Sequence, residues 1–249
     1  MTVRNAFQLL FIGLLTVGMG VPGILFALLL PGTGRKGRFF RVLSKSYSRA
    51  AFAVLGVTVS VRGRENVDPD RPYLFMANHI SLADSPAIAI AVPQTLHWVF
   101  KKELSRIPVF GWVLLACGQI MVDRHDPERS RDALGAAAGS LSGNRSVLIY
   151  PEGTRSRDGT LLPLRKGGFH MALRAGLPIV PVRVSGSREI VAADTLRIRG
   201  GTVVVEFFPP IPTEGVKEEE IPALRERVAE ALRGGTTGPG ERTAATPPP

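Results

Sequence analysis

Apolar and polar positions along the chain fall into three successive patterns. Residues 7–30 are almost continuously apolar, residues 57–208 carry short apolar runs separated by mixed stretches, and residues 234–249 are rich in glycine, threonine and proline. Short apolar runs predict buried strands, and mixed stretches of helical period predict helices. We therefore predict a membrane-anchoring segment with a basic amphipathic helix over 1–56, one folded domain over 57–233, and a disordered tail over 234–249.

The middle region contains the signals of an α/β fold. Strands are predicted over residues 57–61, 73–77, 97–100, 119–122, 147–150, 179–184 and 203–208. Helices are predicted over about 85–92, 109–117, 127–142 and 167–176, with a last amphipathic helix over 217–233. Such alternation predicts a mixed, mostly parallel sheet covered by helices. The run at 179–184 includes Pro181, which has no N–H to donate and disfavours a regular central strand.

The apolar run from Phe7 to Leu30 is the candidate membrane segment. Its 24 residues would span about 36 Å as a helix, which suffices to cross a bilayer core. A cleaved signal peptide would be shorter and would end in a small-residue cleavage site. Pro22 and several glycines favour a kink near the middle. A second helix over 39–55 either lies at the membrane surface or packs on the domain, and the sequence leaves both alternatives open.

Charge refines this picture of the N-terminal region. The formal net charge is +10, and residues 1–60 contain seven cations but no acid, since the first acidic residue is Glu65. Basic residues beside an apolar run predict contact with anionic lipid at the cytoplasmic face of the cell membrane. Few aromatic residues interleave with these cations, so a nucleic-acid partner is not expected. A single cysteine, Cys117, fits a reducing compartment, and four scattered histidines predict no metal site.

The segment from residue 77 to residue 86 holds the strongest candidate for chemistry. His79 and Asp84 lie between a predicted strand and a predicted helix, where α/β proteins usually expose their active residues. A neutral imidazole can take a proton from a hydroxyl near pH 7, and a carboxylate on its other nitrogen stabilises the imidazolium that forms. The alternative is that Asp84 only caps the helix ahead of Pro86, with His79 a polar turn residue.

A second candidate directly follows the predicted strand 147–150, and its sequence is Tyr150-Pro151-Glu152-Gly153-Thr154-Arg155-Ser156. Gly153 permits a close approach of the backbone, and Arg155 offers a planar fork of donors, so the segment suits an oxyanion or a phosphate. Glu152 is expected to hold Arg155 or to bond a substrate hydroxyl. The alternative is a surface turn with an Arg–Glu pair.

Two further cations follow other predicted strands and are candidate phosphate ligands. Lys101 comes after the strand at 97–100, and Arg124 comes after the strand at 119–122. For the lysine the alternative is a solvated turn. For the arginine the alternative is an ion pair with Asp123 or Asp126.

Taken together and in this order, these segments resemble the motifs of the glycerolipid acyltransferase family, specifically the 1-acyl-glycerol-3-phosphate acyltransferases. The corresponding segments are Asn78–Asp84 for NHxxxxD, Lys101–Gly111 for K-x-E-L…P-x-x-G, Gly118–Arg124, Pro151–Ser156 for PEGTRS, and Ile179–Val182. The resemblance covers about residues 55–210. Tyr150 stands where phenylalanine is often expected, and the motif positions show no other departure.

The resemblance implies an enzyme that moves a fatty acyl group from an acyl thioester to the sn-2 hydroxyl of 1-acyl-glycerol-3-phosphate. His79 would be the general base and Asp84 its partner. The acceptor phosphate would be held by Arg155, Gly153 and Thr154, with Glu152, Lys101 and Arg124 as lesser candidates. The implied partners are acyl-CoA or acyl carrier protein as donor, lysophosphatidic acid as acceptor, and membrane lipids, and no cofactor is expected.

Three alternative functions would require other sequence features or another acceptor. A serine esterase or lipase would need a G-x-S-x-G nucleophile elbow, which the sequence lacks. A catalytically silent lipid-binding protein would be favoured by the loss of His79 or Asp84, and both are present. An acyltransferase of the same family with another acceptor, such as glycerol-3-phosphate, a lysophospholipid or another lipid alcohol, is compatible with the motifs and stays open.

Overall fold

The computed structural model describes residues 3–123, 125–140, 145–191 and 198–234. Within them, seven strands form one sheet in the order β1-β7-β6-β2-β5-β3-β4. The strands are β1 Val57–Arg62, β2 Leu74–Ala77, β3 Thr95–Lys101, β4 Ile120–Val122, β5 Arg145–Ile149, β6 Ile179–Ser185 and β7 Gly201–Phe207. Every neighbouring pair is parallel except β6 and β7, which are antiparallel. The predicted mixed, mostly parallel sheet is therefore confirmed.

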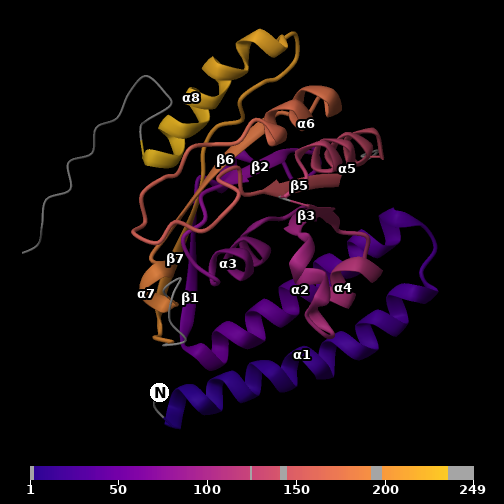
Figure 1. Ribbon diagram of the computed structural model, residues 1–249. Coiled ribbons are helices and arrows are strands. Elements are labelled where there is room, and N and C mark those ends of the chain that lie inside the picture. Colours follow the sequence, from indigo (N-terminus) through magenta and orange to yellow (C-terminus); the bar gives the residue numbers. More distant parts are fainter. Residues whose placement is uncertain (1–2, 124, 141–144, 192–197, 235–249) are drawn as a thin grey trace, which may run out of the picture.

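Helices cover both faces of this sheet (Figure 1). They are α1 Val3–Leu29, α2 Gly32–Leu55, α3 Asp84–Ala91, α4 Phe110–Ala116, α5 Pro127–Ser140, α6 Gly167–Ala175, α7 Ser187–Ile190 and α8 Ile221–Arg233, with 3₁₀ turns at Arg64–Asn66, Lys102–Arg106 and Glu218–Glu220. One core lies between the sheet and the helices α2 and α3, and it includes Phe75 and Phe207. The other lies under α5, α6 and α8 and includes Met76 and Phe169.

Strand β2 is the central strand that carries the candidate chemistry. All four of its side chains are completely buried, because helices cover the sheet on both sides. It pairs in parallel with β5 from Leu74 opposite Val147, and with β6 as far as Ala77 opposite Val182. The carboxyl ends of β2, β5, β6 and β3 therefore meet at one edge of the sheet, so the segments that follow them are brought together.

The expectation that Pro181 would disfavour a central strand is wrong. Pro181 lies within β6, the third strand of seven in the sheet. The antiparallel pairing of β6 with β7 runs only from Val182 to Ser185, so the proline stands just outside it. The Pro181 carbonyl still accepts the N–H of Phe208, which follows the end of β7. The missing donor therefore falls where the neighbouring strand has already ended.

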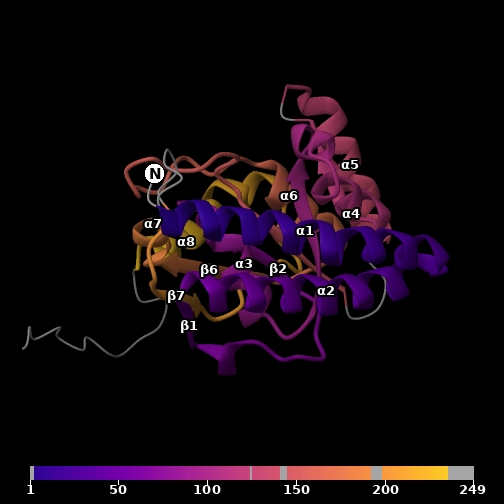
Figure 2. The same cartoon turned by 90° about the horizontal axis from the view of Figure 1, so that it is seen from below.

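The N-terminal region is a pair of helices that lie against each other and against the domain (Figure 2). Helix α1 continues through Pro22 without a break. Its Gln8 side chain donates to the Val54 carbonyl of α2 at 3.4 Å, and its Thr16 hydroxyl is 3.0 Å from the Tyr47 hydroxyl. Helix α2 packs its buried face, which includes Phe40, Phe52 and Leu55, against α3, β3 and β1 of the domain.

Helix α1 is nevertheless exposed over most of its surface. It has the length and the mean hydropathy, 2.2, of a helix that crosses a membrane, and only 11% of its most apolar window is buried. Large apolar side chains remain exposed along it, at Phe7, Leu10, Leu14, Val17, Val21, Leu25, Phe26, Leu28 and Leu29. An apolar surface of this extent is a candidate membrane anchor.

Candidate active site

His79 and Asp84 form a direct pair on the turn between β2 and α3. The His79 Nδ1 atom lies 2.8 Å from Asp84 Oδ2, and the same oxygen accepts the backbone N–H groups of Ile80 and Ser81 at 2.8 Å each. The Asp84 side chain is completely buried, whereas 17% of the His79 side chain is exposed. A buried carboxylate is thus held by the turn itself, with the imidazole between it and solvent.

This geometry separates the two alternatives that the sequence left for Asp84. Helix α3 begins at Asp84, and the N-cap position is Ala83, which makes no side-chain capping bond. The carboxylate points back into the preceding turn, so Asp84 is not the N-cap of α3. Because an ionised carboxylate only accepts hydrogen bonds, Nδ1 of His79 carries the proton and Nε2 of the neutral ring has the free lone pair. Such a ring can accept a proton from a hydroxyl at Nε2.

The segment that follows β5 clamps the backbone of His79. The N–H of His79 donates to Glu152 Oε1 at 2.7 Å, and the carbonyl of His79 accepts the N–H of Ser156 at 2.8 Å. The second Glu152 oxygen accepts the N–H of Leu162 at 2.8 Å. Burial raises the pKa of the Glu152 carboxyl, while these backbone donors oppose the rise. Glu152 therefore joins two backbone segments, a structural role that the sequence did not indicate.

Four other candidate phosphate ligands lie at the same edge of the sheet, at or after the ends of β3 and β5: Lys101, Gly153, Thr154 and Arg155. Gly153 has a φ of +74°, and a Cβ there would lie 2.6 Å from Arg165 Nε, so the position requires glycine. Thr154 is exposed, and Arg155 is partly buried with an Nη1 atom that has no partner among the described residues. Lys101 ends β3, two strands away from β2. Arg124 lies outside the described residues.

Three contacts that sequence reasoning missed complete the surroundings of the pair. The side-chain amide of Asn78 bonds both backbone groups of Val184 on β6, at 2.9 and 2.7 Å. The hydroxyl of Ser187, at the start of α7, donates to Asp84 Oδ1 at 2.5 Å. The ring of Tyr150 stacks on the imidazole of His79. The available signal was the position of each residue at the end of a predicted strand or within three residues after it.

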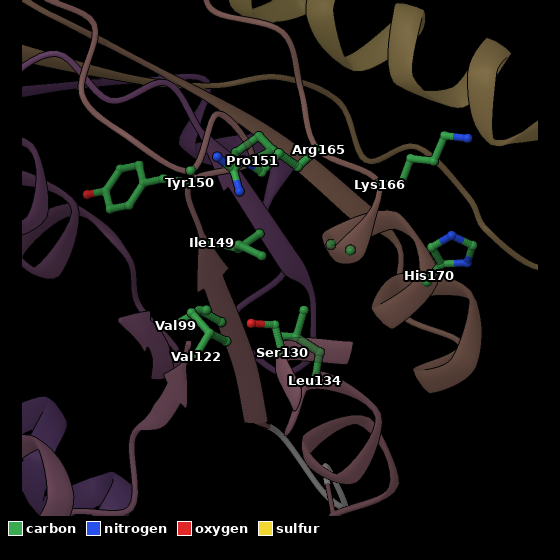
Figure 3. A pocket seen from close by; sticks show the side chains of 13 residues that line it. Val99, Val122, Ser130, Leu134, Ile149, Tyr150, Pro151, Arg165, Lys166 and His170 are labelled. Atoms are coloured by element: carbon green, nitrogen blue, oxygen red, sulfur yellow. The ribbon is translucent and has the colours of Figure 1, made fainter. Parts of the chain in front are cut away.

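A cavity of about 360 Å³ opens next to this site (Figure 3). Its apolar walls come from β3, β4, β5 and α5 and include Val99, Val122, Leu134 and Ile149. Arg165, Lys166 and His170 line it on the side of α6, as Figure 3 shows. Tyr150 and Gly153 belong to the lining, so the cavity lies beside the segment that contacts His79. Its chemistry suits an apolar chain with an anionic group at one end.

Comparisons with known proteins agree with the motifs. The family model described as Acyltransferase matches residues 58–185. The chain is 33% identical over 181 residues to the 1-acyl-sn-glycerol-3-phosphate acyltransferase alpha of Bos taurus, covering 71% of this chain and 62% of that protein. It is 29% identical over 218 residues to the 1-acyl-sn-glycerol-3-phosphate acyltransferase of Saccharomyces cerevisiae, covering 86% and 72%.

A solved structure is similar over nearly the whole chain. The crystal structure of the 1-acyl-sn-glycerophosphate (LPA) acyltransferase PlsC from Thermotoga maritima superposes with a TM-score of 0.76 at 27% sequence identity, covering 93% of this chain and 95% of that one. By sequence, the chain spans about 62% of the length of the first curated relatives that it matches. The family model spans half of the chain and contains both His79 and Arg155. The chain therefore belongs to the acyltransferase family.

Proposed function

We propose that the protein is a 1-acyl-sn-glycerol-3-phosphate acyltransferase, which moves a fatty acyl group from an acyl thioester to lysophosphatidic acid. The observation that carries this proposal is the 2.8 Å contact between His79 Nδ1 and a fully buried Asp84 carboxylate, at the carboxyl edge of the sheet. The activity named for the relatives from cattle, yeast and Thermotoga maritima supports it.

In the proposed reaction His79 acts as the general base. Nε2 takes the proton of the sn-2 hydroxyl while the hydroxyl oxygen attacks the thioester carbonyl. The new C–O ester bond forms, the C–S bond breaks, and the leaving thiolate takes the proton back from the imidazolium. The Asp84 carboxylate fixes the tautomer of His79 and stabilises its cationic form. The products are phosphatidic acid and the free thiol of the donor.

The acceptor phosphate is assigned to the segment that clamps His79. The guanidinium of Arg155 has an unpartnered Nη1 atom, and a planar guanidinium can bind two phosphate oxygens at once. Gly153 and Thr154 stand directly before it in the same turn. Because Glu152 and Ser156 tie this turn to the backbone of His79, a phosphate bound here would lie at a fixed position relative to the base. Lys101 and Arg124 are secondary candidates.

The apolar cavity is assigned to a fatty acyl chain. It shares Tyr150 and Gly153 with the candidate site, and its cations Arg165 and Lys166 give one end a positive charge. Acyl-CoA and acyl carrier protein are both anionic donors, so this charge suits either of them. We propose that the donor thioester is delivered to this opening and that its carbonyl meets the acceptor hydroxyl beside His79.

Membrane docking of the protein follows from the exposed face of α1. Helix α1 contacts α2 along its length, at Gln8, Thr16 and Phe26, and it also packs on α4 of the domain. We therefore propose that α1 lies in one leaflet, beneath the domain, instead of crossing the bilayer. Large apolar side chains are also exposed on and near α4, which packs against α1, at Ile107, Phe110, Trp112, Leu115 and Met121. The cations of α2 would then face anionic headgroups at the cytoplasmic surface of the cell membrane.

The proposal is tested with the purified full chain in detergent. Lysophosphatidic acid is offered with acyl-CoA and, separately, with acyl carrier protein, and both phosphatidic acid and released thiol are quantified. Glycerol-3-phosphate and a lysophospholipid with a choline headgroup serve as competing acceptors, and His79→Ala serves as the inactive control. If acyl transfer to one of these competitors is faster than transfer to lysophosphatidic acid, that competitor is the acceptor and the proposal is wrong. Equal activity in His79→Ala would overturn the assignment of the base.

A further inference from the structure

Tyr150 packs face to face with the ring of His79. Their ring centroids lie 3.9 Å apart, and the two planes are inclined by only 16°. Tyr150 directly follows β5, the parallel neighbour of β2, so the pairing of the two strands brings the phenol ring over the turn that carries His79. The stack therefore depends on the fold, since the two residues are far apart in the sequence.

The hydroxyl of Tyr150 is tied to the helix that begins with Asp84. It lies 2.8 Å from the hydroxyl of Ser85. Burial, aided by the negative charge of Asp84, raises the pKa of the Tyr150 hydroxyl well above its usual value. The phenol thus stays protonated in the neutral range. Its ring is held at one end by β5 and at the other by α3.

We propose that Tyr150 is a positioning residue for His79, and this inference rests on the proposed function. The bond from Nδ1 to Asp84 fixes one atom of the imidazole but leaves the plane of the ring free to tilt about that point. The stacked phenol fixes the plane, and with it the direction of the Nε2 lone pair. The electron-rich face of the phenol also favours the imidazolium that forms when His79 takes a proton. Ser85 holds the phenol through its hydroxyl and so also contributes to the position of His79.

The test compares three variants with the wild-type chain. Tyr150→Leu keeps an apolar cover over His79 but removes the aromatic face, so kcat should fall roughly 5- to 30-fold while the acceptor KM stays the same. Tyr150→Phe keeps the stack and should retain most of the wild-type kcat. Ser85→Ala removes the anchor and should give a smaller loss than Tyr150→Leu. The acid limb of the kcat–pH profile should move to lower pH in Tyr150→Leu, because the cationic ring loses a stabilising neighbour while Asp84 and Glu152 still face His79.

Tyr73→Leu is the matched control for this substitution. Tyr73 is a buried core residue. It directly precedes β2, at the opposite end of that strand from His79. Its truncation should destabilise the fold at least as much as Tyr150→Leu does, but it should leave both kcat and the pH profile unchanged. Unchanged turnover in Tyr150→Leu would overturn the proposal, as would an equal loss of turnover in Tyr73→Leu. A raised acceptor KM at unchanged kcat would make Tyr150 a substrate contact instead.

A readout without turnover separates this proposal from the proposed function. In proton NMR, the carbon-bound ring protons of His79 should show a ring-current displacement in the wild type and in Tyr150→Phe, and should lose it in Tyr150→Leu, with His79→Ala used for assignment. A wild-type chain that transfers no acyl group but shows the displacement would refute the function and leave the stack in place. An active chain without any displacement would refute the positioning role alone.

Discussion

Replacing Asp84 by asparagine removes the charge behind His79 while keeping most of the surrounding hydrogen bonds. In the native site, Oδ2 accepts from His79 Nδ1 and from the N–H groups of Ile80 and Ser81, and Oδ1 accepts from Ser187. The amide oxygen of asparagine can take the position of Oδ2. Its NH₂ group then meets the Ser187 hydroxyl, which can accept as well as donate.

The expected effect on turnover follows from the contact distance. Unit charges at the observed 2.8 Å attract by roughly 6 kcal/mol at an effective dielectric constant of about 20. Since each 1.36 kcal/mol is a factor of ten in rate, the ceiling for the loss of the anion is on the order of 10⁴-fold. Part of this attraction is retained by the amide dipole, which still accepts from Nδ1. We therefore expect kcat to fall by about 10²- to 10³-fold.

The expected effect on stability is small for asparagine and large for alanine. Neutral hydrogen bonds contribute less than charge-assisted ones, but removing a buried charge also removes its desolvation cost, so Asp84→Asn should change the free energy of unfolding by less than about 2 kcal/mol. Asp84→Ala leaves four donors without their acceptor, each costing about 1–3 kcal/mol when buried. It should destabilise the protein by about 3 kcal/mol or more, against about 1 kcal/mol for the loss of a helix cap.

Both variants are assayed for thiol release at saturating substrates and for denaturant-induced unfolding in the same detergent. His79→Ala is the reference, and the double variant with Asp84→Asn should be barely slower than His79→Ala, because residues that act as a unit are not additive. Wild-type turnover in Asp84→Asn would refute the reasoning. A loss of only about 1 kcal/mol in Asp84→Ala would contradict the buried hydrogen-bond network.

Arg155→Lys keeps the charge but loses the planar fork, so the acceptor KM should rise more than the donor KM in steady-state assays; equal rises would make Arg155 structural. Burial lowers the pKa of His97, so the unfolded chain binds more protons as the pH falls through about 6.5. Unfolding curves at pH 7.5 and 5.5 should therefore show a larger loss of stability in the wild type than in His97→Gln, and equal losses would exclude His97 as the cause. In vesicles that contain brominated lipid, Trp112 should be quenched in a Trp98→Phe background. In Trp112→Phe, the fluorescence of Trp98 should not be quenched by the brominated lipid. If neither tryptophan is quenched, docking through α4 is refuted.

Local patterns were sufficient to predict the seven strands and most of the helices, but not the short helix α7. The seven apolar runs became the seven strands because each has the length and composition of a strand that is buried on one or both faces. The spacing from His79 to Asp84 indicated a pair because their contact is closed within a single turn, although helix capping by Asp84 was an equal alternative from the sequence. The error at Pro181 arose because its placement depends on a distant segment. Pro181 is tolerated because β7 ends beside it, and the end of β7 is set by residues more than twenty positions later.

The remaining parts of the site depend on contacts between distant segments. Ser187 reaches Asp84 across 103 positions of sequence, and Glu152 reaches the backbone of His79 across 73. No local period or propensity reports such contacts, because they exist only when β5 and β6 lie beside β2. The structural role of Glu152, which joins the backbone of His79 to that of Leu162, therefore could not be predicted from its neighbours in the sequence.

The helical hairpin of α1 and α2 has a consequence for how the chain reaches its membrane. Helix α1 ends at Leu29 and α2 begins at Gly32, so the chain reverses direction within a few residues and returns to the domain through Gly56. Under the proposed docking, none of the cations of α2 has to pass through hydrocarbon. The finished polypeptide would then need no translocation channel and would insert after its release from the ribosome. Synthesis in a membrane-free system, followed by the addition of vesicles, should accordingly give protein that floats with the lipid.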